Sequence, residues 1–422
     1  MGGSSRRKKV KNNDFLSLGV SSFHSDRLKE KNIAVPSEIQ SRVIPLLLKR
    51  NNVLFRSATG TGKTFAYLLP ILHSLMNGGT QNNTGPSCVI AAPTHELCSQ
   101  IKQETDFLLS GTKFKAVLLI GSAQIGRQIE ALKKDKPAIV IGNPGRLLSL
   151  ASERKLKLNN IEFLVLDEGD RLVSDELMEE TSSLVSLIAE AKHRQNPADS
   201  VADNYCFVAC SATFSDKTRE RLFSLPGAAI AAKIKYIETT ENILKELVEH
   251  WAIFSDDRDK ILTLRSLIVA LKLTKKKAVG KNSSIGKVLI FTARGRDVAN
   301  ITAKLRHFNL DAAGLWGDMD RKVRKQSLDD FRSGKVRLLV TSDLAARGLD
   351  IQDIEYVIAL DTAENPDQYI HRVGRTARAG KTGIMITIGD EVEMRRLSVL
   401  EKRLGMAVNP KELFEGKITK CQ

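Results

Sequence analysis

The stretch Ser57–Phe65, SATGTGKTF, has the residue types of a phosphate-binding loop and follows the apolar run Val53–Phe55. Glycines let backbone N–H groups turn toward an anion, the lysine reaches the outer phosphates, and the hydroxyl binds Mg²⁺. The generic pattern has a glycine where this chain has Ser57, so an ordinary tight turn between a strand and a helix remains the alternative. On the first interpretation, the nucleotide is held by Ala58, Thr59, Gly60, Thr61, Gly62, Lys63 and Thr64, with Thr64 as a magnesium ligand.

An acidic pair, Asp167 and Glu168, follows a second apolar run, Phe163–Leu166. Alone, such a pair is often a turn or a helix cap. Together with a phosphate-binding loop upstream it is typical of a magnesium-dependent NTPase. One carboxylate, Asp167, holds the hydrated Mg²⁺, and its neighbour Glu168 polarises the attacking water. The two motifs together predict an enzyme that hydrolyses a nucleoside triphosphate.

Short apolar runs alternate with amphipathic stretches along most of the chain, which is typical of parallel sheets covered by helices. The strands expected in the first half are Val53–Phe55, Cys88–Ala92, Ala116–Ile120, Ala138–Ile141, Phe163–Leu166 and Cys206–Ala209. After about Pro226 the pattern restarts, with expected strands Lys287–Phe291, Asp311–Leu315, Arg337–Thr341, Tyr356–Leu360 and Gly383–Ile388. The predicted fold class is therefore α/β, with two tandem domains, each a mostly parallel sheet with helices on both faces. Ligands of such sheets bind at the carboxyl ends of strands, where both motifs stand.

The restart and the composition also predict the domain boundaries. Residues 1–14 form a flexible basic tail, 15–230 the first domain, 231–246 a connector and 247–422 the second domain. The tail lacks the apolar core of a secretory signal, and a remnant of an organellar transit peptide is the alternative. The polar stretches 193–204 and 272–287 are expected surface loops, and for the basic second one an RNA-gripping arm is the alternative.

The composition describes a globular chain with a basic surplus. Of 422 residues, 42% are hydrophobic and 27% charged, with a net charge of +16. Such a surplus favours a polyanionic partner, with a basic solubility surface as the alternative. Cys88, Cys206 and Cys210 lie in apolar runs without C-x-x-C spacing, which favours buried thiols in an intracellular, reducing compartment: cytoplasm, nucleus, mitochondrion or plastid. No apolar run is long enough to span a bilayer.

The order of motifs resembles that of the DEAD-box ATP-dependent RNA helicases, with the signature spelled Asp-Glu-Gly-Asp at 167–170. The resemblance extends from about Phe15 to Ile388 and implies two RecA-like domains, with ATP and Mg²⁺ as cofactors. The stretch IAVPSEIQ (33–40) is similar to the family's Q motif. By this resemblance, Gln40 reads the adenine edge, Phe15 is the isolated upstream aromatic, and Ile33 takes the place of the aromatic that stacks on the base.

Several short loops resemble the motifs with which the family holds the RNA backbone, although such loops also occur as plain strand–helix connectors. The expected RNA contacts are Pro93, Thr94, Gly121, Gly145, Arg146, Arg324, Thr341 and Ser342. Departures from the family pattern stand at Asn32, Ile33, His95, Ser122, Asn143, Gly169, Trp316 and Arg321. A neutral histidine lacks the permanent charge and the donor fork of the usual arginine, so a phosphate contact can be lost at His95.

The remaining motifs are expected to link the ATP state to the RNA state. The resemblance assigns this coupling to Asp170, Ser211, Thr213 and His371, places Gly348 and Asp350 near the nucleotide, and directs Arg375 and Arg378 at the γ-phosphate. The two arginines stand about one helical turn apart, so both can point at one spot and neutralise charge in the transition state. For the stretch SAT (211–213), the cap of a following helix is the alternative.

The expected catalytic residues are thus Lys63, Asp167, Glu168, Arg375 and Arg378, divided between two domains. We expect RNA-stimulated ATP hydrolysis, coupled through closure of the cleft between the domains to unwinding of short RNA duplexes or remodelling of RNA–protein complexes. The alternative is an ATP-gated RNA clamp with little unwinding. RNA is the expected partner, with protein cofactors or ribonucleoprotein complexes beside it, and a monomer without membrane contact is expected. Gly169, in place of the usual alanine, costs about 0.5–1 kcal/mol of backbone order and is expected to slow the ATPase or loosen its coupling.

Overall fold

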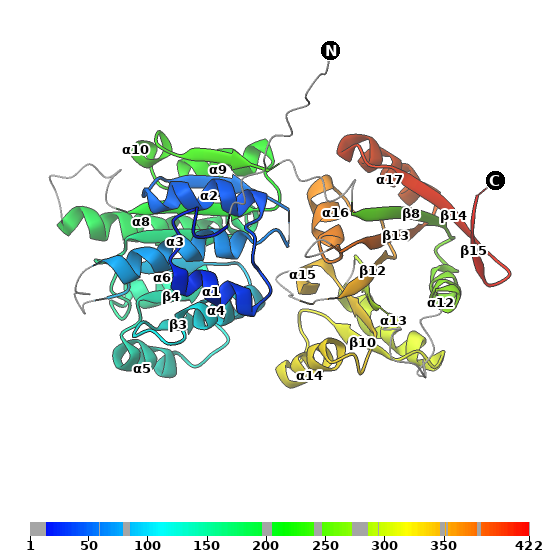
Figure 1. The fold of residues 1–422 in the computed structure, drawn as a ribbon. Helices are drawn as coiled ribbons and strands as arrows, with labels where there is room; N and C mark the ends of the chain where they lie inside the picture. Colours follow the sequence, from blue (N-terminus) through cyan, green and yellow to red (C-terminus); the bar gives the residue numbers. More distant parts are fainter. Residues whose placement is uncertain are drawn as a thin grey trace, which may run out of the picture. The chain divides into compact units, whose positions relative to one another are not determined.

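The computed structural model divides after Thr239 into two compact units, each described here by itself (Figure 1). It describes residues 14–58, 60–78, 85–195, 205–239, 247–271, 286–293, 295–346, 351, 353–377 and 381–421. None of the helices in these ranges combines the length and the apolar character that crossing a bilayer requires.

The first unit is a seven-stranded parallel sheet with helices on both faces. Its strands are β1 (Val53–Arg56), β2 (Cys88–Ala91), β3 (Ala116–Leu119), β4 (Ile139–Gly142), β5 (Phe163–Asp167), β6 (Cys206–Ser211) and β7 (Lys235–Glu238). Its helices are α1 (Ser22–Glu30), α2 (Glu38–Leu48), α3 (Lys63–Asn77), α4 (His95–Leu109), α5 (Ile125–Asp135), α6 (Pro144–Ser152), α7 (Gly169–Leu172), α8 (Met178–Gln195), α9 (Asp216–Ser224) and α10 (Ala228–Ala231).

The strand order β3-β4-β2-β5-β6-β1-β7 places β5 and β6 at the centre of the first sheet. In β5, Phe163 and Val165 pack into a hydrophobic cluster with α2, α3 and α4, whereas Leu164 and Leu166 pack into a second cluster with α6 and α8. A strand sends alternate side chains to opposite faces, so an apolar strand needs helices on both. By the same alternation Asp167, which ends β5, falls on the α3 face.

Polar caps fix where the helices after the loops begin. Ser37 starts α2 in a capping box with Gln40, and the Thr94 hydroxyl accepts a hydrogen bond from Leu97 N–H (3.2 Å) at the start of α4. Such caps satisfy backbone donors that the first helical turn leaves unpaired. Side-chain caps therefore fix the first residues of α2 and α4.

The second unit is an eight-stranded sheet of order β10-β11-β9-β12-β13-β8-β14-β15, parallel except that β14 pairs antiparallel with β15. Its strands are β8 (Val248–Phe254), β9 (Lys287–Phe291), β10 (Ala312–Leu315), β11 (Leu338–Thr341), β12 (Ile354–Ala359), β13 (Gly383–Gly389), β14 (Val408–Phe414) and β15 (Lys417–Lys420). Its helices are α12 (Lys260–Ala270), α13 (Gly295–His307), α14 (Arg321–Arg332), α15 (Asp343–Ala346), α16 (Pro366–Val373) and α17 (Glu391–Leu404). One face packs on α14, α16 and α17, the other on α12 and α13.

The predicted fold class is confirmed, and every expected strand is present, with no end shifted by more than two residues. Four strands were not predicted: β7, β8, β14 and β15. β7 lies inside the expected connector and pairs with β1, so the first unit extends to Thr239 instead of residue 230. Residues 240–246, the expected tail up to residue 13, and most of the two expected surface loops lie outside the described residues.

Candidate nucleotide site and RNA-binding loops

The loop between β1 and α3 has the backbone turns that a phosphate nest requires. Gly60 and Gly62 have φ angles of +80° and +86°, in the left-handed region that glycine enters without strain. At Gly62 a Cβ would lie 2.3 Å from Gln40 Nε2. Both conformation and space therefore require glycine at this position, which favours the phosphate-loop interpretation over an ordinary turn.

Polar groups hold the loop from within. The Thr61 hydroxyl donates to Ala58 O (2.8 Å), and Lys63 Nζ donates to Ser57 O (2.8 Å). Burial lowers the pKa of Lys63, and acidic groups at the ends of β5 and β6 oppose that shift. The Lys63 side chain thus lies across the same loop that is expected to hold the phosphates with it. Thr59 lies outside the described residues.

The acidic pair marks a sharp turn at the end of β5. Asp167 is 3% exposed, and Glu168 adopts φ +51° and ψ +51° before α7 begins at Gly169. The left-handed region costs a residue with a Cβ roughly 1–2 kcal/mol. Strain of this kind is concentrated at functional sites, where the surrounding structure enforces it.

The two expected magnesium ligands share one neighbour. The Tyr67 hydroxyl donates to Asp167 Oδ2 (2.8 Å); burial raises its pKa, and the Thr64 side chain beside it opposes that rise. Thr64 and Asp167 are therefore near enough to serve one ion. The described residues hold no cluster of three or more His, Cys, Asp or Glu side chains suited to a metal. A hydroxyl and a carboxylate nonetheless fit Mg²⁺, which commonly uses one or two carboxylates together with substrate phosphates and water.

Gln40 is already engaged with the phosphate loop. Its Oε1 accepts a hydrogen bond from Ser37 N–H (2.9 Å), and its Nε2 donates to Gly62 O (3.1 Å). A primary amide keeps a further acceptor and a further donor position. Gln40 can therefore read an adenine edge while it ties α2 to the loop that holds the phosphates.

The segment before α2 corrects one expectation. Phe15 is 1% exposed and packs in the cluster of α2 and α3, so its ring presents no free face to a base and supports the Q-motif segment from beneath. Ile33 is half-buried against the same cluster. Asn32, which stands where the family has glycine, takes φ +60°, and asparagine tolerates that region better than most residues.

The loops expected to hold RNA follow β2, β3 and β4, which are neighbours in the sheet. Arg146, in the first turn of α6 after β4, donates to Gly121 O (3.0 Å) and Ala123 O (3.2 Å) in the loop after β3. Asn143 Nδ2 donates to Ala92 O (3.1 Å) in the loop after β2. The arrangement brings the three loops together, and the segment from Ala92 through Pro93 to the capping residue Thr94 is part of it.

Gly145, in the first turn of α6, is closely approached by a side chain of α8. A Cβ on Gly145 would lie 2.7 Å from a carboxylate oxygen of Glu180. The backbone at Gly145 is thus packed closely against α8, where it follows Pro144 at the start of α6.

The expected link between the acidic motif and SAT is present. The Thr213 hydroxyl donates to Asp170 Oδ2 (2.7 Å), and the Ser211 hydroxyl accepts a hydrogen bond from Thr213 N–H (3.3 Å). The alternative role of this stretch, capping α9, falls to Ser215, whose hydroxyl accepts from Thr218 N–H.

In the second unit, Thr341 and Ser342 end β11 and are buried. Arg324 Nη1 donates to Trp316 O (3.1 Å) and Nη2 to Ala345 O (3.3 Å). Arg324 therefore holds the segment after β10 against α15, and a guanidinium has further N–H groups for a phosphate.

Arg375 does not lie beside these residues. It is 5% exposed, its Nε donates to His371 O (3.2 Å), and it lines a cavity of about 420 Å³ with Lys287 and Ile354. These two residues begin β9 and β12, so Arg375 is at the amino ends of the strands, whereas Thr341 is at a carboxyl end. Gly348, Asp350 and Arg378 lie outside the described residues.

Sequence reasoning missed a buried ionic cluster in the second unit. Arg372 is 1% exposed, and its Nη2 lies 2.7 Å from Asp343 Oδ2 and 2.8 Å from Asp361 Oδ1. The cluster ties α15 and the end of β12 to α16, so it fixes the segment that carries His371 and Arg375. The three residues are distant in sequence, and no local pattern marks them as partners.

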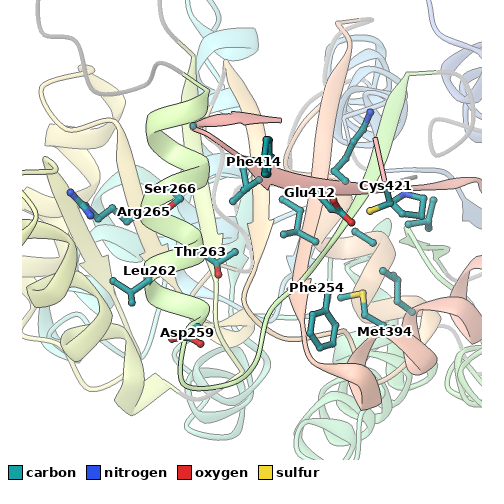
Figure 2. Close-up of a pocket in the computed structure, with 18 of the residues that line it drawn as sticks. Phe254, Asp259, Leu262, Thr263, Arg265, Ser266, Met394, Glu412, Phe414 and Cys421 are labelled. Carbon is teal, nitrogen blue, oxygen red and sulfur yellow. The ribbon is translucent and has the colours of Figure 1, made fainter. Parts of the chain in front are cut away.

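A cavity of about 940 Å³ in the second unit shares no residue with the predicted site (Figure 2). It is walled by α12, α17 and the β14–β15 hairpin, with Phe254 and Phe414 61% and 64% exposed. Its size therefore does not identify it as the nucleotide site.

Two tandem parallel sheets, with a phosphate-binding loop after β1 and an acidic pair after β5, define a RecA-like ATPase. Comparison with known families then identifies the branch: residues 37–222 match the DEAD/DEAH box helicase model, and residues 260–380 match the helicase conserved C-terminal domain. The chain is 34% identical over 386 residues to the DEAD-box ATP-dependent RNA helicase CshC of Bacillus cereus, covering 92% of this chain and 90% of that one. It is 30% identical to the probable ATP-dependent RNA helicase YfmL of Bacillus subtilis, covering 94% and 96%.

Solved structures give the same fold. S. cerevisiae Dbp5 bound to RNA and ADP BeF3 matches with a TM-score of 0.76 and 26% identity, over 94% of this chain and 95% of that one. Mss116p bound to ssRNA and AMP-PNP matches with a TM-score of 0.82 and 22% identity, over 97% and 81%. The chain belongs to the DEAD-box ATP-dependent RNA helicases and is an ATP-hydrolysing enzyme of that family.

Proposed function

We propose that the chain couples RNA-stimulated ATP hydrolysis to local unwinding of short RNA duplexes or to remodelling of RNA–protein complexes. The observation that carries this proposal is the order of the first sheet. Strands β1, β5 and β6 carry the nucleotide and coupling residues, and the adjacent β2, β4 and β3 carry the expected RNA loops. Ligands that favour one arrangement of a shared framework bind cooperatively, so ATP and RNA should strengthen each other's binding.

In this proposal each residue of the nucleotide site has one role in hydrolysis. Gln40 reads adenine, Lys63 binds the outer phosphates, and Glu168 orients the attacking water. Thr64 and Asp167 hold Mg²⁺, which, when bound, neutralises charge on the phosphates. Gly348 and Asp350 approach the nucleotide, and Arg375 and Arg378 of the second unit supply positive charge at the γ-phosphate during turnover.

RNA is held through its backbone, because the loops offer arginine, hydroxyl and backbone N–H donors more than groups that read bases. The structure of Dbp5 bound to RNA and ADP BeF3 supports this partner. Binding should therefore weaken steeply with salt and vary little with sequence. Replacing the RNA strand by DNA of the same sequence should weaken it further, because 2′-hydroxyl contacts are lost.

A strand-displacement assay tests the proposal, with ATP beside a non-hydrolysable analogue and a short RNA duplex with a single-stranded overhang. ATP-dependent release of the labelled strand supports unwinding. Stable RNA binding that needs ATP, without strand release, supports the ATP-gated clamp instead.

We place the protein in an intracellular, reducing compartment, which is supported by four buried free thiols.

A further inference from the structure

The carboxylate of Asp167 is held by two side chains that no motif includes. Tyr67 of α3 donates its hydroxyl to Oδ2 (2.8 Å), and the Cys210 thiol of β6 donates to Oδ1 (3.1 Å). The Glu168 backbone N–H also donates to Oδ1 (2.9 Å). Both oxygens of this buried acid therefore have donors supplied by the protein.

The fold sets these contacts directly. Tyr67 stands one helical turn after Lys63, which points it from α3 toward the sheet. Cys210 is the register partner of Asp167 across the β5–β6 pair. Both side chains lie fully buried in the cluster on the α3 face, where the strand alternation also places Asp167.

The pattern of donors leaves one side of the carboxylate open. Each carboxylate oxygen accepts about two hydrogen bonds. Among the described residues Oδ1 accepts two, from Cys210 and Glu168, and Oδ2 accepts one, from Tyr67. Oδ2 therefore keeps an open acceptor position, and Thr64, the other expected magnesium ligand, stands three residues before Tyr67 on α3.

We propose that Tyr67 and Cys210 are positioning residues of the magnesium site, which fix the orientation of the Asp167 carboxylate that would hold the metal. The proposal rests on the proposed function, in which Asp167 and Thr64 hold Mg²⁺. Groups behind a metal ligand commonly orient it and set its basicity, and their loss typically lowers metal affinity about 10–100-fold. Tyr67 and Cys210 therefore determine how tightly this chain holds Mg²⁺ with its nucleotide.

The test is a Mg²⁺ titration of fluorescent ADP binding to the full chain, with affinity in EDTA measured beside it. Tyr67→Phe keeps the ring and removes the hydroxyl, and it should raise the Mg²⁺ midpoint about 10-fold while leaving the EDTA affinity unchanged. Cys210→Ala should raise the midpoint less, because a thiol is a weak donor. Cys210→Ser restores a donor and should restore the midpoint.

Matched controls separate positioning from packing. Tyr205→Phe removes a buried hydroxyl that has no hydrogen-bond partner among the described residues, and Cys88→Ala removes a buried thiol from β2. Neither should move the midpoint, and melting curves verify that all variants fold. If Tyr67→Phe fails to fold, the Cys210 pair carries the test.

The outcomes distinguish the inference from the function beneath it. A Mg²⁺ midpoint that is the same in wild type, Tyr67→Phe and Cys210→Ala overturns the positioning role alone. Wild-type ADP binding that does not respond to Mg²⁺ overturns the magnesium site and the inference with it.

Discussion

The backbone at Glu168 takes a left-handed turn that is unfavourable for any residue with a Cβ. Contacts on both sides hold it there: Asp167 is in register with Cys210 on the β6 side, and Asp170 accepts a hydrogen bond from Thr213. These contacts hold the backbone from which the Glu168 side chain extends. A fixed backbone at this position favours a preorganised site, which is what orientation of an attacking water requires.

Gly62 is the loop position at which we expect a substitution to be tolerated least. Gly62→Ala should weaken fluorescent ADP binding more than 10-fold, because the new methyl group would meet Gln40 Nε2 and φ would stay at +86°. The expected loss corresponds to about 1.4 kcal/mol or more. Gly126→Ala is the control, since a Cβ there meets nothing within 4 Å. Equal affinity in both variants would show that the loop adapts freely.

Gly169 has space for a methyl group if one neighbour moves. An added Cβ would lie 3.2 Å from Leu222 Cδ2, in a helix where alanine is favoured over glycine by about 0.5–1 kcal/mol. We expect the backbone order that alanine adds to stabilise the transition state, so Gly169→Ala should raise RNA-stimulated turnover roughly 2–5-fold. The double variant with Leu222→Val removes the crowding and should show at least the same gain. Unchanged turnover in both would remove Gly169 from the account of activity.

At the scale of elements, a hydrogen bond joins the segment after β6 to α7. Thr213→Val keeps the shape of the side chain and removes the bond to Asp170 (2.7 Å). A bond to a charged group contributes about 1.5–3 kcal/mol, so strand displacement per ATP hydrolysed should fall about 10-fold while ADP binding stays unchanged. Thr105→Val, in α4, removes a buried hydroxyl far from β6 and serves as the control. A fall in ADP affinity instead would assign Thr213 to the nucleotide.

The turn after α16 contains a strained alanine. Ala377 has φ +52° and is 4% exposed. Ala377→Gly should relieve about 1 kcal/mol of strain and raise the melting temperature of the second unit's transition by about 2–4 °C. Ala359→Gly, within β12, has no such strain and should lower it. A lower melting temperature for Ala377→Gly would mean that the buried methyl group contributes more than the strain costs.

The elements also show what sequence patterns can and cannot specify. Strands such as β5 were predictable because continuous apolar runs are needed when both faces of a parallel sheet are covered. β7 is only four residues long and begins and ends with a charged residue, and Glu249 and His250 interrupt β8. The β14–β15 hairpin is mostly exposed, so none of these strands is a continuous apolar run. At the site, Lys63 and Asp167 were predictable from motifs, whereas Tyr67 and Cys210 look like ordinary core residues. Tyr67 and Cys210 contact Asp167 because of the helical phase of α3 and the register of β5 with β6, and no local sequence pattern predicts either of these.

At the scale of the whole molecule, one buried histidine should make stability depend on pH. Burial, with His73 and Arg27 adding, lowers the pKa of His24 to about 4. In the unfolded chain the group binds a proton below about pH 6.5, so unfolding takes up a proton in this range. Stability should therefore fall by roughly 3 kcal/mol as pH drops from about 6.5 to about 4.

The pH effect is measured by urea unfolding of the full chain across this range. His24→Leu should flatten the dependence between about pH 6.5 and pH 4. His307→Leu, at an exposed position on α13, should leave it unchanged. A wild-type curve that is flat over the same range would contradict the account of His24.

The central claim is that the end of β5 and the loop after β1 together hydrolyse ATP in response to RNA. Its most direct test is the RNA-stimulated ATPase rate of Glu168→Gln, measured beside fluorescent nucleotide affinity and with the exposed Glu153→Gln as the matched control. We predict that Glu168→Gln binds nucleotide as wild type does and loses about 10²–10⁴-fold in rate, whereas Glu153→Gln keeps the full rate. A wild-type hydrolysis rate in Glu168→Gln would contradict the claim.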